Sequence, residues 1–250
     1  MTTRDPSADA PRATAATAPS RGARRRWLRR LSWVFFGIAI LLLVEGALVL
    51  TWKEPFTSYL QSRSQAALSA ELRERLDAPA AARELAAIPE GAGPAATKLL
   101  GELDIGDAVG RLEIPAIGLK QAVIQGTDSA RLRRGPGHYP ESSLPGLGRT
   151  TAIAGHRTTW GAPFRHLDDL DPGDLIIVRL PYGTARYRVI GTRVVDDQDF
   201  SILRNVGRER LILTACHPLY SASHRLVVYA ELQGARVPAG AVANLPGRPL

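Results

Sequence analysis

The chain has 250 residues, of which 45% are hydrophobic and 22% are charged, so it can build a core and is not disordered throughout. A mean hydropathy of −0.07 excludes a protein with several membrane spans. The net charge of +8 would favour nucleic acid on a folded face, but eight arginines and two aspartates place +6 of it in residues 1–30. The basic character therefore belongs to a tail, and nucleic acid is not an expected partner.

An apolar segment follows these arginines. Residues 31–52 read LSWVFFGIAILLLVEGALVLTW and contain one charged residue, Glu45. A helix of this length crosses a hydrocarbon core of about 30 Å, so we expect a transmembrane signal-anchor. A cleaved signal peptide is the alternative, although its apolar core is usually only about 7–15 residues long. Because only Lys53 directly follows the span, the positive-inside rule predicts a single-pass cell-membrane protein with a cytoplasmic N-terminus and an extracellular domain.

The segments on either side of this span differ in composition. Residues 1–30 are predicted to be a disordered, basic cytoplasmic tail, because they contain few side chains that could form a core. Residues 53–106 are predicted to be a juxtamembrane helix over 57–76 and then a linker, rich in Ala, Pro and Gly, over 78–106. We expect residues 54–106 to act as a tether rather than to fold against the domain that follows.

Short strand-like runs fill residues 107–235, which are predicted to form the globular domain, whereas residues 236–250 are predicted to be a flexible tail. Turn residues separate the runs, which fall at 111–114, 118–124, 150–154, 175–178, 184–195, 211–215 and 226–232. Seven or eight short strands with no regular helix between them indicate an all-β fold, either an antiparallel barrel or a sandwich.

The sole cysteine, Cys216, lies in a domain expected outside the cell, where cysteines are generally paired. It ends the apolar run LILTA two residues before Pro218, at a strand end of the kind that often displays reactive groups. An inert, buried side chain is the alternative interpretation. Cys216 is therefore a candidate nucleophile.

The next run begins at Arg225, and symmetric antiparallel pairing would place Arg225 opposite Cys216. Opposed residues share a face of the sheet, with Cβ atoms about 4.5–5.5 Å apart. The guanidinium would then favour the thiolate and could hold a developing oxyanion. A solvated edge arginine is the alternative.

A nucleophilic thiol also needs a group that moves protons, and the chain has five histidines. His217 and His224 are adjacent to Cys216 and Arg225 in their strands and should therefore point to the opposite face. His166 falls in a predicted turn, and His138 lies in a loop of Gly and Pro. The best candidate is His156, which directly follows the strand-like run TTAIAG.

The sequence resembles the sortases, most closely class E and then class D. The resemblance covers residues 109–233 and rests on GPGHYPESSLPGLGRTTAIAGHRTTWGAPFRHLDDLDPGD, residues 135–174, and LILTACHPLYSASHRLVVYAEL, residues 211–232. It implies an eight-stranded sortase-type barrel with short helices, in which His156 is the catalytic histidine and Cys216 the nucleophile. Arg225 would stabilise the transition state or orient the substrate. Ala215 departs from the family pattern, which usually has threonine before the cysteine.

The resemblance also implies a function. A sortase is a membrane-anchored cysteine transpeptidase that cleaves an LPxTG-like or LAxTG-like sorting signal between Thr and Gly through a thioacyl intermediate. Its partners would be surface proteins that bear the signal and a peptidoglycan precursor that supplies the acceptor amine. No cofactor or metal is expected. The alternatives are a membrane-tethered cysteine peptidase that only hydrolyses and a noncatalytic, surface-binding β-barrel.

Overall fold

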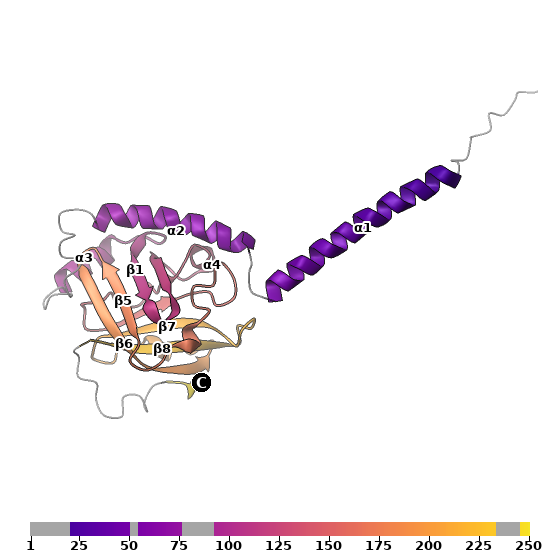
Figure 1. Ribbon diagram of the computed structural model, residues 1–250. Coiled ribbons are helices and arrows are strands. Elements are labelled where there is room, and N and C mark those ends of the chain that lie inside the picture. Colours follow the sequence, from indigo (N-terminus) through magenta and orange to yellow (C-terminus); the bar gives the residue numbers. More distant parts are fainter. Residues whose placement is uncertain (1–20, 51–54, 77–92, 234–245) are drawn as a thin grey trace, which may run out of the picture. The chain divides into compact units, whose positions relative to one another are not determined.

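The computed structural model describes residues 21–50, 55–76, 93–233 and 246–250, and the chain divides into two compact units after Lys53. The first unit contains one long helix, α1, Arg21–Leu50 (Figure 1). Within it, Arg25–Ala47 is long and apolar enough to cross a membrane. The helix starts at Arg21 rather than at residue 31, because the arginines before the apolar segment are also good helix formers. The disordered tail predicted for residues 1–30 is therefore wrong at residues 21–30, and its part at residues 1–20 lies outside the described residues.

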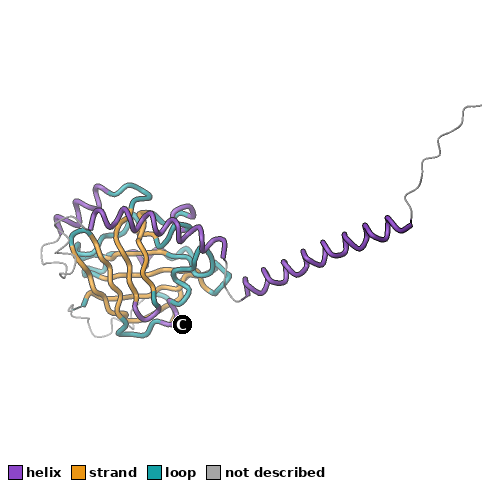
Figure 2. Tube along the Cα trace, turned by 45° about the horizontal axis from the view of Figure 1, so that its top comes forward, coloured by secondary structure: helices purple, strands orange, loops and turns teal. Residues whose placement is uncertain are grey.

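Eight strands of the second unit close into a barrel, which confirms the predicted fold class (Figure 2). The sheet order is β5-β1-β2-β3-β4-β7-β8-β6, and pairing of β6 with β5 closes it. The strands are β1 Ala108–Ile114, β2 Leu119–Gln125, β3 Gly137–His138, β4 Thr150–Ala154, β5 Leu175–Leu180, β6 Gly183–Asp196, β7 Arg210–His217 and β8 His224–Leu232. Short helices connect some of them: η2 Pro115–Ile117, α4 Ser129–Leu132, η3 Leu167–Asp169 and η4 Phe200–Leu203.

Two pairings in this sheet are parallel, so the expectation of an antiparallel barrel was wrong at these places. β2 pairs with β3, and β4 pairs with β7, in parallel register. The chain between β4 and β7 includes β5 and β6, and this long connection lets two strands of the same direction become neighbours. The parallel pair aligns Ala154 with Thr214, so both strands end at the same side of the barrel.

The barrel interior is filled by alternate side chains of the strands. Strand β5 shows the pattern clearly, since Ile176, Val178 and Leu180 are buried while the residues between them are partly exposed. The inward residues join one core cluster that also takes Leu213 from β7 and Val228 from β8. The sequence predicted this strand from the apolar run LIIV after the turn residues Pro172 and Gly173, and the alternation of burial appears only in the structure.

Two helices pack on the barrel where a tether was expected. Helix α2, Pro55–Leu76, buries Leu68 and Leu72 against Ala122 and Ile124 of β2 (Figure 1). Helix α3, Gly93–Glu102, buries Ala96 and Leu99 in the main core cluster, so the linker prediction does not hold over this range. The helix predicted over 57–76 is present, but its apolar side chains pack against the barrel, so the helix is not a free tether. The linker residues 77–92 lie outside the described part of the chain.

A half-buried amide fixes α2 to the barrel. Gln65 accepts a hydrogen bond from the backbone N–H of Ala122 at 2.8 Å and donates to the carbonyl of Ala122 at 3.1 Å. Its Nε2 also donates to the carbonyl of Arg134 at 2.9 Å. A Cβ atom at Gly135 would overlap the Gln65 amide nitrogen, so a larger residue there would displace this amide from its partners. The single side chain of Gln65 thus joins α2 both to β2 and to the segment that leads into β3.

The end of the chain also contacts the barrel. Arg248–Pro249 form a short strand, β9, that pairs with β6 at Arg193 and Val194. Strand β5 pairs only with the first half of β6, so β9 covers part of an edge that would otherwise be open. The flexible tail predicted for 236–250 is therefore wrong at its last residues, and its part up to residue 245 lies outside the described residues.

Candidate active site

His156 stands just beyond the end of β4. The N–H of Gly155 donates to the carbonyl of Thr214 at 3.0 Å, which extends the β4–β7 ladder by one residue, and the N–H of Phe164 donates to the carbonyl of His156 at 3.0 Å. A Cβ atom at Gly155 would overlap the Phe164 ring, so glycine lets the chain pass this ring closely. Backbone contacts on both sides therefore set the position of His156.

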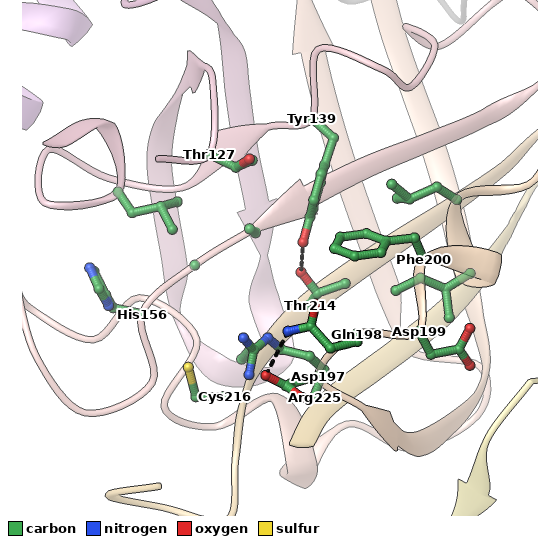
Figure 3. A pocket seen from close by; sticks show the side chains of 16 residues that line it. Thr127, Tyr139, His156, Asp197, Gln198, Asp199, Phe200, Thr214, Cys216 and Arg225 are labelled. Atoms are coloured by element: carbon green, nitrogen blue, oxygen red, sulfur yellow. Dashed lines mark hydrogen bonds between the residues drawn. The ribbon is translucent and has the colours of Figure 1, made fainter. Parts of the chain in front are cut away.

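Cys216 and Arg225 face each other across β7 and β8, as the sequence predicted. The register pairs Cys216 with Arg225 directly, and Cys216 is a half-buried free cysteine. Nη1 of Arg225 donates to the carbonyls of Ala222 at 2.8 Å and of His224 at 3.0 Å. These two bonds hold the guanidinium at the turn between the strands, beside the sulfur (Figure 3).

All three predicted side chains line one cavity of about 300 Å³. His156 and Cys216 lie on the same side of it, and the Arg225 guanidinium lies next to Cys216 (Figure 3). We call this side, formed by the ends of β4, β7 and β8, the ladder wall. Parallel register between β4 and β7 and antiparallel register between β7 and β8 bring the three groups together although they are far apart in the sequence.

The imidazole of His156 is held in its neutral form. Burial, and then the positive charge of Arg133, lower the pKa of His156. Its Nε2 atom is buried and has no hydrogen-bond partner among the described residues. A neutral, partly buried imidazole can accept a proton from a thiol and later donate it to a leaving group.

A short helix forms the opposite side of the cavity, which we call the η4 wall and define as residues 200–204. The side chains of Phe200, Ile202 and Leu203 line the cavity, and Phe200 is exposed at 64%. Asp199 begins the helix by accepting a hydrogen bond from the N–H of Ser201 at 3.0 Å. Nothing in the sequence indicated this wall, because the run FSIL lies between strands and carries no catalytic side chain.

Further side chains complete the cavity between the two walls. The Tyr139 hydroxyl and Thr214 Oγ1 form a hydrogen bond of 3.0 Å inside it (Figure 3). Thr214 and Ala215 both line the cavity, so a threonine hydroxyl is present one position before the place where sortases usually have it. Asp197 and Asp199 also line the cavity. A hydrogen bond from the Gln198 side chain, and to a smaller extent the charge of Arg225, lower the pKa of Asp197.

The other four histidines are not among the residues that line the cavity. His138 is buried and bonded through both ring nitrogens, to Gln125 Oε1 at 2.8 Å and to the carbonyl of Ser143 at 3.0 Å. His166 contacts Asp169 at 2.8 Å, and His224 contacts the Ser223 hydroxyl at 2.9 Å. The expectation that His138 lies in a loop was wrong, because it belongs to strand β3 and pairs with Ile153 of β4. None of the four lines the cavity, which leaves His156 as the candidate.

His217 has a partner that the sequence did not suggest. Nη1 of Arg157 donates to Nδ1 of His217 at 3.1 Å, and Arg157 also forms an ion pair with Asp168. Arg157 is buried, and its charge helps, after burial itself, to lower the pKa of His217. The residues that follow His156 and Cys216 are thus joined on the side away from the cavity. Within the described ranges, no three His, Cys, Asp or Glu side chains lie close enough together to hold a metal ion.

Comparisons with known proteins agree with this geometry. Residues 112–233 match the family model described as the sortase domain. Sortase D of Bacillus subtilis is 36% identical over 132 residues, which cover 51% of this chain and 65% of that protein. Sortase SrtE1 of Streptomyces coelicolor is 28% identical over 148 residues, which cover 53% of this chain and 42% of that protein. The matches thus span less than two thirds of either relative.

A solved structure shares the fold. The Clostridium perfringens sortase D5 transpeptidase superposes with a TM-score of 0.58 at 22% identity, covering 69% of this chain and 99% of that chain. Both classes suggested by the sequence pattern occur among these relatives. The share of identical residues is higher for sortase D, at 36%, than for SrtE1, at 28%.

Proposed function

This chain belongs to the sortase family, and we propose that it is a membrane-anchored cysteine transpeptidase acting on proteins with a C-terminal sorting signal. The observation that carries the proposal is the meeting of His156, Cys216 and Arg225 in one cavity. A thiol, a neutral imidazole and a fixed guanidinium supply the nucleophile, the proton carrier and the oxyanion donor that acyl transfer needs.

The first half of the reaction forms a thioester. His156 takes the proton of the Cys216 thiol, and the sulfur attacks the carbonyl carbon of the Thr–Gly bond of the signal. The oxyanion that develops is stabilised by Arg225. The imidazolium then gives its proton to the glycine nitrogen as the C–N bond breaks, which releases the glycine fragment and leaves the threonine acyl group on the sulfur.

The second half forms a new amide. An amine of a peptidoglycan precursor attacks the thioester carbonyl, and its proton passes through His156 to the departing Cys216 sulfur. Water in place of the amine would give hydrolysis instead. No step in this sequence needs a group that the three side chains and the two substrates do not supply.

The hydrogen bonds of Arg225 support its proposed role. Both of its bonds to described residues come from Nη1 and go to the backbone of the β7–β8 turn. The N–H groups at Nε and Nη2 of Arg225 can therefore face an oxyanion near the sulfur, while the bonds of Nη1 hold the guanidinium in place.

The substrate we propose is an LPxTG-like or LAxTG-like signal. Its leading leucine would pack on the η4 wall, whose Phe200, Ile202 and Leu203 offer an apolar surface opposite the thiol. The apolar helix α1 supports anchoring in the cell membrane, and the arginines before it support a cytoplasmic N-terminus with the barrel outside the cell. Because Cys216 is the sole cysteine of the chain, a membrane-impermeant thiol reagent added to intact cells should label the wild-type protein but not its Cys216→Ala variant.

The proposal is tested with the full chain in detergent micelles. We expect LPxTG or LAxTG peptides to be cut between Thr and Gly and, with an added amine, to be joined to it, as measured by mass spectrometry. The Cys216→Ala variant should fold with an unchanged melting temperature and show neither product. Cleavage that survives in this variant would refute the mechanism. Hydrolysis that never gives way to ligation would identify a peptidase, and an inert wild type would identify a noncatalytic barrel.

A further inference from the structure

A buried arginine lies behind the η4 wall. Arg210 begins β7, six residues before Cys216, and its exposed fraction is only 3%. No carboxylate among the described residues forms an ion pair with it, because Glu231, its partner in register, accepts from Arg208 instead at 3.0 Å. A charge in this position is costly unless hydrogen bonds compensate it, so its contacts show what it holds.

The Arg210 guanidinium lies over the ring of Tyr229 in β8, 5.6 Å from its centroid, and its hydrogen bonds to backbone carbonyls go to the η4 wall. Nη2 of Arg210 donates to the carbonyl of Ile202 at 2.8 Å and to the carbonyl of Arg204 at 3.1 Å. Arg204 is the residue that ends η4, where helical carbonyls have no partner within the helix. The guanidinium therefore binds the last turn of the segment whose side chains line the cavity.

A threonine on the neighbouring strand completes this contact. Nε of Arg210 donates to Thr150 Oγ1 at 3.1 Å, and Thr150 Oγ1 donates to the carbonyl of Arg204 at 2.9 Å. Thr150 and Arg210 are partners in register at the start of the parallel strands β4 and β7. The same two strands place His156 and Cys216 at their other ends, so the η4 wall is tied to the strands that carry the reacting groups.

We propose that Arg210 is a positioning residue for substrate recognition. Through the carbonyls of Ile202 and Arg204 it fixes the η4 wall at the distance from Cys216 that the apolar residue of a sorting signal requires. Lysine cannot replace it, because an ammonium group is a point donor and cannot reach Thr150 and the two carbonyls in one plane. This proposal rests on the proposed function only in that its kinetic readout needs a peptide that the wild type cleaves.

The test compares Arg210→Lys with a matched control, Arg208→Lys, in the full chain in micelles. Loss of one charge-assisted hydrogen bond should raise the KM for the signal peptide about tenfold in Arg210→Lys, with kcat changed less than about twofold. Arg208 contacts Glu231 and not the η4 wall, so Arg208→Lys should keep the wild-type KM. The alkylation rate of Cys216 by iodoacetamide should be equal in all three proteins.

A second readout does not depend on catalysis. Amide hydrogen exchange of residues 200–205 should become faster in Arg210→Lys and stay unchanged in Arg208→Lys. If Arg210→Lys fails to fold, Thr150→Val removes part of the same contact without a change of charge and should raise KM by a smaller factor.

An unchanged KM and unchanged exchange in a folded Arg210→Lys variant would overturn the proposal. A fall in both kcat and the alkylation rate of Cys216, together with a lower melting temperature, would also overturn it. That pattern reports only general destabilisation of the protein. If the wild type cleaves no peptide, the proposed function fails, while the exchange measurement still decides whether Arg210 holds the wall.

Discussion

The two walls of the cavity are positioned by different kinds of contact. On the ladder wall, backbone hydrogen bonds place Cys216 opposite Arg225 and carry the β4–β7 pairing up to Gly155. On the η4 wall, the side chains of Arg210 and Thr150 hold the carbonyls of a short helix. Backbone pairing survives most side-chain substitutions, whereas a side-chain contact is lost with one residue. Substitutions on the ladder wall should therefore alter chemistry, and those behind the η4 wall should alter recognition.

The largest expected effect concerns the proton carrier on the ladder wall. His156→Gln keeps a polar side chain of similar size but cannot transfer a proton. We expect kcat for peptide cleavage to fall about 10³-fold with little change in KM. Steady-state kinetics with the signal peptide measures both constants. A variant that keeps more than a tenth of the wild-type kcat would show that another group moves the proton.

A smaller effect is expected for the oxyanion donor. In Arg225→Lys the charge remains, but the planar fork is lost, so kcat should fall about 10²-fold. Iodoacetamide alkylation of Cys216, which forms no oxyanion, should fall much less than cleavage does. An equal loss in both reactions would mean that Arg225 acts on the thiol rather than on the transition state.

Stability gives a test of side-chain positioning at another place. Gln65→Leu removes the amide that bonds the N–H and carbonyl of Ala122 and leaves buried backbone groups without partners. We expect the free energy of unfolding to drop by about 1–3 kcal/mol, as measured by urea denaturation. Gln198→Leu is the control, since the exposed Gln198 amide donates one solvent-exposed hydrogen bond, to Asp197, and its loss should change stability little. Equal effects of the two substitutions would show that α2 is not fixed through Gln65.

The smallest expected effect is a pH dependence of the free energy of unfolding, through His138, whose contacts reach strand β4 just before His156. Burial lowers the pKa of His138, whose Nε2 also contacts Ser142 Oγ at 3.1 Å, and Ser142 Oγ accepts from the N–H of Ala152 in β4. Below about pH 6.5 the unfolded chain binds a proton that the folded chain does not, so stability falls as pH falls, by at most about 1.4 kcal/mol per pH unit.

The control for this effect is His138→Asn. It removes the titrating group, so the decline in unfolding free energy between about pH 6.5 and pH 5 should become shallower than in the wild type, whatever the variant's stability at pH 7. His156 and His217 also have lowered pKa values and remain in both proteins, so the difference in slope isolates His138. Identical slopes would show that His138 does not titrate in this range.

The contrast between the walls also explains what could be predicted from the sequence. The pairing of Cys216 with Arg225 was predictable because one turn joins the two strands, so alternation fixes which residues share a face. The same rule set aside His217 and His224, and His156 was chosen because it directly follows the strand-like run TTAIAG. Arg210 was missed because an arginine at the start of a strand has the sequence signature of an exposed charge. Its burial depends on how the preceding helix η4 folds against it and on Thr150, which is 60 residues away in the sequence.

Other parts of the fold depend on contacts that are distant in sequence. The parallel β4–β7 pairing joins strands separated by β5 and β6, and local turn signals carry no information about it. Helix α3 was predicted to be a linker because its segment is rich in alanine and proline. The residues that it buries, Ala96 and Leu99, do not stand out in such a sequence. Their burial becomes evident only when the barrel surface beneath them is known.

The central claim is that Cys216 carries the acyl group of a sorting signal during turnover. The most direct measurement is to mix the full chain with LPxTG or LAxTG peptide without an amine, quench with acid within the first turnover, and map adducts by mass spectrometry. We predict a mass increase equal to the fragment ending in threonine, located on the peptide that contains Cys216 and removed by added hydroxylamine. Peptide cleavage without any adduct on Cys216 in such a quenched sample would contradict the account.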